Sequence, residues 1–235
     1  MIRAASFDIW LTLIRSNPGF KEARNELLRQ AVAPNVGPLE FAAALRAADV
    51  EADHLAEQTG RNLDLADRLR LACTKLAVDM DLSGGMVARL RAEQHTIALA
   101  LPPVLMHESV PELLAELAAH IPLAITSNTG MIPAGTMRAL LDHLGLIDSF
   151  AVATFSDEVG YAKPDPRIFH ATLVGLAELT VRHLGGTVVH VGDNPHADVD
   201  GATASGLQPV LVGPDAPIED ALAGFIRHAR TGAAA

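Results

Sequence analysis

The sequence predicts an α/β protein in which a doubly wound parallel sheet carries an inserted all-helical domain. Short apolar runs recur along the chain, and helical patterns separate the later ones. An acidic residue follows the run near the N-terminus, and another follows the run near residue 190. The interval after the first run is about a hundred residues long and contains no convincing strand, far too long for a simple crossover connection.

Five apolar stretches predict the strands of the sheet. Stretches that are apolar on both faces are typical of buried parallel strands. They are Ala4–Phe7, Leu123–Thr126, Ala151–Phe155, Val188–Val191 and Pro209–Val212. Because helical patterns alternate with the last four, we expect a Rossmann-like, doubly wound arrangement.

Two helix starts are predicted in the C-terminal part. Ser109 with Glu112 three residues later forms a candidate capping box, and the apolar residues of 110–117 fall on one helical face. Asp165 followed by Pro166 marks a second start, because aspartate caps a helix and proline fits its first position.

The long interval predicts a helical cap over residues 15–102, inserted into a core formed by 1–14 and 103–235. Two amphipathic stripes predict two helices, and we expect two more within 64–78 and 86–99, separated by Ser83-Gly84-Gly85. The stripes consist of Phe20, Ala23, Leu27 and Leu28, and of Phe41, Leu45, Ala48, Ala52 and Leu55.

The composition limits the classes of binding partner and the cellular compartment that we expect for this protein. The 235 residues are 49% apolar and carry a formal net charge of -10, which argues against binding to a nucleic-acid backbone. The sequence offers neither a basic membrane-surface helix nor an apolar run that approaches a membrane span. Cys73 is the only cysteine and no secretion signal is recognisable, so we expect a cytoplasmic protein without an internal disulfide. The oligomeric state is left open.

Three aspartates follow predicted strands at positions where a ligand crevice forms. Asp8 follows the first strand, and Asp193 and Asp198 follow the strand that ends at Val191. Because ligands bind beyond the carboxyl ends of adjacent strands, we expect these carboxylates to converge. Carboxylate oxygens suit Mg²⁺, with Asp193 as a direct ligand and Asp198 behind it. The alternative is ordinary turn and helix-start chemistry.

Ser127 and Asn128 follow another apolar strand and precede a helical pattern. Their side chains and the nearby backbone N–H groups could cradle an anion, although Ser-Asn is also common in turns. Thr12 lies just after the first strand, where we expect it to hydrogen-bond the backbone of the turn.

Four segments in this order resemble the motifs of the haloacid dehalogenase superfamily of hydrolases. They are Phe-Asp-Ile-Trp-Leu-Thr-Leu, Ala-Ile-Thr-Ser-Asn, Tyr-Ala-Lys-Pro-Asp-Pro-Arg-Ile-Phe and Gly-Asp-Asn-Pro-His-Ala-Asp. The resemblance implies Asp8 as nucleophile, Ser127 as the phosphate-binding hydroxyl and Lys163 as the cation that neutralises both. It also implies a magnesium site at Asp8, Trp10, Asp193 and Asp198, a substrate surface that includes Trp10 and Asn128, and a helical cap that selects substrates.

Position 10 departs from the family's phosphatases. They carry there a second aspartate, which protonates the leaving alcohol and then activates water, whereas this chain has Trp10. Indole cannot transfer that proton, so Trp10 either packs structurally or forms a wall against an apolar substrate group. His107 and His196 are candidate replacement acids. Arg15 and Arg24 are candidate substrate contacts from the cap.

Three functions are compatible with this pattern. The first is magnesium-dependent hydrolysis of a small anionic phosphate ester through an aspartyl-phosphate on Asp8. The second is a dehalogenase-like displacement at carbon, which the aromatic at position 10 favours and Asp193 opposes, because the family's dehalogenases lack that aspartate. The third is a binding or regulatory protein that retains the fold and metal pocket.

Overall fold

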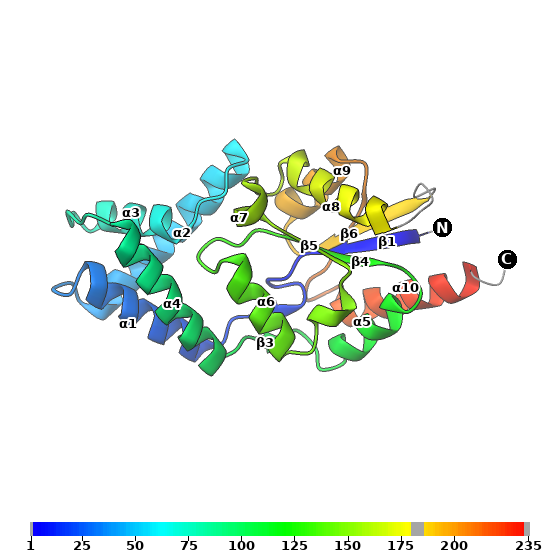
Figure 1. The fold of residues 1–235 in the computed structure, drawn as a ribbon, viewed down its shortest axis with the longest axis horizontal. Coiled ribbons are helices and arrows are strands. Elements are labelled where there is room, and N and C mark those ends of the chain that lie inside the picture. Colours follow the sequence, from blue (N-terminus) through cyan, green and yellow to red (C-terminus); the bar gives the residue numbers. More distant parts are fainter. Residues whose placement is uncertain (1, 180–185, 233–235) are drawn as a thin grey trace.

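The computed structural model describes residues 2–179 and 186–232, which form an α/β core beside a group of helices (Figure 1). In chain order the elements are β1 (Ile2–Phe7), β2 (Ile14–Arg15), α1 (Pro18–Val32), α2 (Pro38–Thr59), α3 (Leu65–Lys75), α4 (Gly84–Ala100), β3 (Val104–Leu105), α5 (Val110–Ala118), β4 (Leu123–Ser127), α6 (Ala134–His143), the 3-10 turn η1 (Ile147–Ser149), β5 (Val152–Phe155), α7 (Ser156–Val159), α8 (Pro166–Leu179), β6 (Thr187–Gly192), the π-helical turn η2 (Pro195–Asp200), α9 (Gly201–Ala204), β7 (Gln208–Leu211) and α10 (Ile218–Gly232).

The main sheet has five strands in the order β5-β4-β1-β6-β7, and all neighbouring strands run parallel. Phe7 at the end of β1 pairs with Ile125 of β4 and with Val191 of β6. The three central strands therefore end nearly level, and the residues that follow them share one edge. The predicted parallel α/β fold is confirmed.

Helices cover both faces of this sheet (Figure 1). On one face, Phe7 packs in a buried cluster with residues of α5, α6 and α10, such as Leu114 and Leu222. On the other face, Ala4 packs with Ile168 and with other residues of α8 and α9. Successive residues of β1 point to opposite faces, so both faces need apolar side chains, as the sequence shows.

Helices α1 to α4 lie to the left of the sheet in Figure 1 and pack around a hydrophobic cluster of their own. Leu28, Phe41, Leu69 and Leu90 contribute one side chain from each helix. This separate cluster supports our proposal that residues 15–102 form a cap on a core made of 1–14 and 103–235. The helices predicted within 64–78 and 86–99 are confirmed as α3 and α4.

The two short strands β2 and β3 pair antiparallel where the chain enters and leaves the helical part. Neither strand is recognisable in the sequence, because two residues are too few to show an alternating pattern. Gly84 and Gly85, expected in a linker, belong instead to the first turn of α4, which Ser83 caps through its hydroxyl.

Two local predictions were wrong. Ser109 precedes α5 but makes no capping hydrogen bond, because its hydroxyl contacts His107 Nδ1 at 2.8 Å instead. The hydroxyl of Thr12 is buried and has no hydrogen-bond partner among the described residues, so it does not hold the turn as expected. The start of α8 is as predicted, since Asp165 accepts the backbone N–H of Arg167 at 2.9 Å.

No helix in the described part of the chain is both long and apolar enough to cross a membrane.

Candidate active site

The carboxyl edge of the sheet forms the floor of a cavity of about 450 Å³. Asp8 and Trp10 follow β1, Asn128 follows β4, and Asp193 follows β6. Helices α1, α2 and α3 supply side chains from the opposite side, including Arg24, Asp53 and Arg68. The predicted convergence of the strand ends is therefore observed, and the cavity lies between this edge of the sheet and helices α1, α2 and α3.

Lys163 is buried at the centre of this floor, with only 2% of its surface exposed. Its Nζ donates to Asp8 Oδ1 at 2.7 Å and to Asp198 Oδ1 at 2.6 Å, and the Ser127 hydroxyl donates to Asp8 Oδ1 at 2.8 Å. Asp8 is thus held by two donors on one of its oxygens. The structure therefore brings together Asp8, Ser127 and Lys163, the three residues for which the family resemblance implies catalytic roles.

These contacts shift the pKa values of the buried groups in opposite directions, up for Lys163 and down for Asp198. Burial disfavours the ammonium of Lys163, but Asp198 and Asp8 outweigh it and raise the lysine pKa. Burial likewise opposes ionisation of Asp198, yet Lys163 and the His190 hydrogen bond hold the aspartate pKa below its ordinary value. Burial raises the pKa of Asp8, although Lys163 opposes this shift. The lysine therefore remains charged at neutral pH.

Asn128 positions the backbone that carries Lys163. Its side-chain oxygen accepts the N–H of Lys163 at 2.7 Å, and its side-chain nitrogen donates to the carbonyl of Lys163 at 3.1 Å. The Lys163-Pro164 peptide is cis. Asn128 also lines the cavity, so its predicted contact with substrate stays a prediction beside this observed structural one.

Asp8, Asp193 and Asp198 each offer a carboxylate oxygen within 4.8 Å of the others. Burial raises the pKa of Asp193 to about 6, and the charges of Asp8 and Asp198 add to that shift. Three carboxylates and the ammonium of Lys163 leave a formal charge of -2, which a divalent cation would balance. Hard oxygen donors of this kind fit Mg²⁺.

The carboxylates differ in how they are already bonded. Asp198 Oδ1 accepts from Lys163 and from His190 Nε2, and its Oδ2 accepts the backbone N–H of Asn194 at 3.0 Å. No ion pair of Asp193 occurs among the described residues. This arrangement supports Asp193 as the direct ligand and Asp198 as the residue behind it. Trp10, also predicted in the metal site, could contribute only its main-chain carbonyl.

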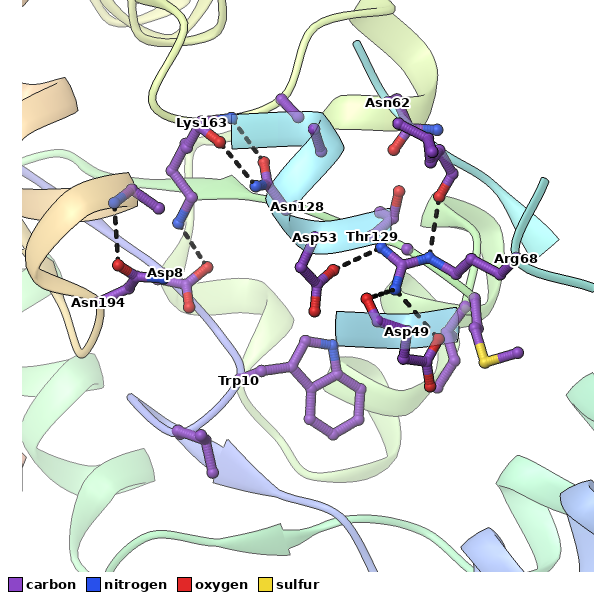
Figure 2. Close-up of a pocket in the computed structure, with 18 of the residues that line it drawn as sticks. Asp8, Trp10, Asp49, Asp53, Asn62, Arg68, Asn128, Thr129, Lys163 and Asn194 are labelled. Carbon is purple, nitrogen blue, oxygen red and sulfur yellow. Dashed lines mark hydrogen bonds and ion pairs between the residues drawn. The ribbon is translucent and has the colours of Figure 1, made fainter. Parts of the chain in front are cut away.

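Trp10 lines the cavity and is half-buried. Figure 2 shows its indole below Asp49 and Asp53 of α2, with Asp8 to one side. The following residue, Leu11, has a φ of 59°, and its N–H donates to the carbonyl of Ile14, so the chain turns back directly after Trp10. The indole thereby forms a wall of the cavity at the position of the missing acid.

Helices α2 and α3 contribute a buried arginine and two aspartates that the sequence did not reveal as site residues. Arg68 of α3 is buried, and its guanidinium donates to Asp49 Oδ1 at 3.1 Å and to Asp53 Oδ1 at 2.6 Å (Figure 2). No local pattern links Arg68 to the two aspartates, because Arg68 lies on α3 and both aspartates lie on α2. Of the two predicted arginines, Arg24 lines the cavity and burial lowers its pKa, whereas Arg15 is exposed and lies outside the described lining.

Neither predicted histidine reaches the site. His107 is exposed and contacts Ser109, and His196 is exposed and pairs with Asp200 at 3.1 Å. Both expectations are therefore wrong as to position, since neither side chain lines the cavity. Among the described histidines the buried one is His190, whose Nε2 lies 3.0 Å from Asp198 Oδ1. Its sequence signal was a single polar residue inside an otherwise apolar strand.

Comparisons with known proteins agree with this geometry. A family model described as haloacid dehalogenase-like hydrolase matches residues 2–206. The phosphoglycolate phosphatase of Rhodospirillum rubrum is 30% identical over 213 residues, which span 90% of this chain and 79% of that protein.

Solved structures show the same fold. The magnesium-bound HAD-hydrolase YfnB of Bacillus subtilis aligns with a TM-score of 0.68 at 19% identity, covering 92% of this chain and 91% of that one. The L-2-haloacid dehalogenase of Xanthobacter autotrophicus aligns with a TM-score of 0.57 at 23% identity, covering 96% of this chain and 84% of that one.

Proposed function

Because this chain belongs to the haloacid dehalogenase-like hydrolase family, we propose that it is a magnesium-dependent phosphatase that acts on a small anionic phosphomonoester. The observation that carries this proposal is the Asp8 carboxylate, fixed by Ser127 and Lys163 at the floor of the cavity. A buried carboxylate with two donors on one oxygen keeps its geometry while the other oxygen faces a substrate.

Each residue of the floor has a role in this reaction. Asp8 attacks phosphorus and forms an aspartyl-phosphate, which water then cleaves. Lys163 and Ser127 donate to phosphoryl oxygens as negative charge develops on them. Asp198 and Asn128 keep Lys163 in place, the first through its ammonium and the second through its backbone.

Asp8 and Asp193 would bind the magnesium ion directly, with Asp198 behind them and the main-chain carbonyl of Trp10 as a further oxygen. When bound, Mg²⁺ would neutralise charge on the phosphoryl group. The raised pKa of Asp193 supports this assignment, because burial and the charges of Asp8 and Asp198 disfavour its ionised form, which a bound cation would stabilise. The related HAD-hydrolase of Bacillus subtilis was solved with magnesium bound.

Trp10 favours a second candidate function, a dehalogenase-like displacement at carbon. A halide leaves without a proton, so such a reaction needs no acid at position 10. The chain also shares its fold with an L-2-haloacid dehalogenase. Asp193 opposes this alternative, because a carboxylate beside Asp8 repels an anionic 2-haloacid unless a cation lies between them.

A panel of phosphate esters and 2-haloacids, each with and without Mg²⁺, separates these functions. We expect phosphate release that requires Mg²⁺ and is abolished in Asp8→Asn, with no halide release. Halide release independent of Mg²⁺ would favour the dehalogenase-like reaction. The absence of both products across the panel would favour a binding protein.

A further inference from the structure

Helix α2 presents a row of carboxylates to the cavity. Asp49, Asp53 and Glu57 are spaced by four residues, so they share one face of the helix, and all three line the cavity. On the core side, the Trp10 indole cannot transfer a proton to a leaving group, Asp193 is assigned to the metal site, and Asp198 is bonded to Lys163. The cap is therefore the place to look for that acid.

Arg68 holds two of the three carboxylates. Its guanidinium donates to both Asp49 and Asp53, and it also donates to the carbonyls of Leu63 and Asp49 (Figure 2). The carboxylates of both aspartates are thus engaged by one guanidinium. Asp49 and Asp53 accordingly serve to join α2 to α3.

Glu57 is bonded differently. Its Oε1 accepts a hydrogen bond from the Asn194 side-chain nitrogen at 3.2 Å, and no ion pair of Glu57 occurs among the described residues. The donor is a neutral amide, which brings no positive charge to the carboxyl group. Glu57 thus differs from its two neighbours on α2, because they pair with Arg68 and Glu57 accepts from a neutral amide.

Asn194 fixes this contact next to the reaction centre. Its side-chain oxygen accepts the backbone N–H groups of His196 and Ala197 at 2.9 and 3.0 Å, and its own N–H donates to Asp198 Oδ2. The amide of Asn194 is thereby rigid, and it directly follows Asp193. Glu57 consequently reaches from the cap to the loop beside the candidate metal ligands.

We propose that Glu57 is the general acid and base of this enzyme, in place of a carboxylate at position 10; this rests on the proposed phosphatase function. As Asp8 attacks phosphorus, the bond from phosphorus to the leaving oxygen breaks, and that oxygen takes its electron pair and the proton of the Glu57 carboxyl group. The Glu57 carboxylate then removes a proton from the water that attacks the aspartyl-phosphate. The phosphorus–Asp8 bond breaks, which releases phosphate and restores both carboxyl groups.

Glu57→Gln tests this role without removing the contact, since the glutamine oxygen can still accept from Asn194. The magnesium-loaded variant is mixed rapidly with 4-nitrophenyl phosphate, whose leaving group needs no proton, or with an alkyl phosphate. We expect a burst of about one nitrophenol per site followed by slow turnover, with phosphorylated Asp8 detected by mass spectrometry after acid quenching. With the alkyl ester, the first turnover should slow by roughly a hundredfold to ten-thousandfold.

Two further variants separate catalysis from docking of the cap. Glu57→Ala loses both the proton donor and the contact with Asn194, and Asp53→Asn removes a carboxylate of the same helix face that pairs only with Arg68. Asp53→Asn should not accumulate phosphorylated Asp8. Adding Trp10→Asp to Glu57→Gln should restore turnover of the alkyl ester.

The outcomes are distinct for the two proposals. Equal losses with both esters and no phosphoenzyme in Glu57→Gln would overturn the acid–base role, as would wild-type behaviour of that variant with a defect only in Glu57→Ala. Neither result contradicts the proposed function, because Asp8-dependent release of nitrophenol by the wild type tests that function independently. Absence of that wild-type release would overturn both proposals.

Discussion

Replacing Asp193 with asparagine should uncouple the stability of the protein from magnesium. Asp193 shares a 4.8 Å cluster with Asp8 and Asp198, and burial together with these charges raises its pKa to about 6. Without a metal, Asp193→Asn removes one of three mutually repelling carboxylates, so the melting temperature should rise slightly. With Mg²⁺, the variant lacks its main ligand, so the stabilisation that the cation gives the wild type should largely disappear.

The size of this effect follows from ligand linkage. Mg²⁺ at a hundred times its dissociation constant stabilises the wild type by about 2.7 kcal/mol. For a chain of this size, each kcal/mol shifts Tm by roughly 2–4 °C, so we expect a shift of about 5–11 °C. If asparagine weakens binding a hundredfold, the same Mg²⁺ concentration adds only about 0.4 kcal/mol, or roughly 1–2 °C.

The magnesium-induced shift should also depend on pH in a defined direction. The unfolded chain releases the Asp193 proton near 3.8, whereas the folded protein retains it until about pH 6. Between these values the metal-free folded state binds more protons, so its stability falls as pH rises and the penalty is complete above about pH 6. Mg²⁺ relieves that penalty by replacing the proton, so its stabilising shift should be full above pH 6 and shrink as pH falls below it.

Thermal denaturation monitored by circular dichroism measures both effects. Asp200→Asn is the matched control, because Asp200 ends the turn η2 that follows Asp193, is exposed, and among the described residues forms an ion pair with His196 alone. We expect this control to keep the wild-type shift at every pH. A magnesium shift that survives unchanged in Asp193→Asn would refute the metal assignment, and a wild-type shift that does not vary with pH would refute the role of the raised Asp193 pKa.

Two further predictions concern Lys163. Lys163→Met leaves two buried carboxylates without their cation, so urea denaturation should show that the free energy of unfolding falls by about 3–5 kcal/mol. Lys75→Met, at an exposed ion pair, should lower it by less than about 1 kcal/mol, and equal losses would show that the buried network adds no stability. Asn128→Ala frees the backbone that positions Lys163, so steady-state kinetics should show kcat lowered on the order of a hundredfold. Asn35→Ala, at an exposed position, should leave kcat unchanged, and an unchanged kcat in Asn128→Ala would contradict the positioning role.

The sequence by itself determined the strands of the sheet and the edge of the sheet at which the candidate site lies. Strands buried on both faces must be apolar throughout, so they stand out as short runs such as 188–191, and the polar residues that end them mark one edge of a parallel sheet. Asp8, Ser127 and Asp193 were identified in this way. The amphipathic pattern of the cap helices was equally readable, because one side of each helix packs on a common cluster.

Only the tertiary structure decided which side chains meet across elements distant in sequence. Arg68 finds its partners on α2, Asn128 holds the backbone of Lys163 35 residues away, and Glu57 reaches Asn194 across 137 residues. Periodicity reports which face of an element is apolar, but it carries no information on the relative placement of two elements. For the same reason, the sequence position of His196 suggested a place in the active site, whereas in the structure its side chain is exposed and lies beside Asp200.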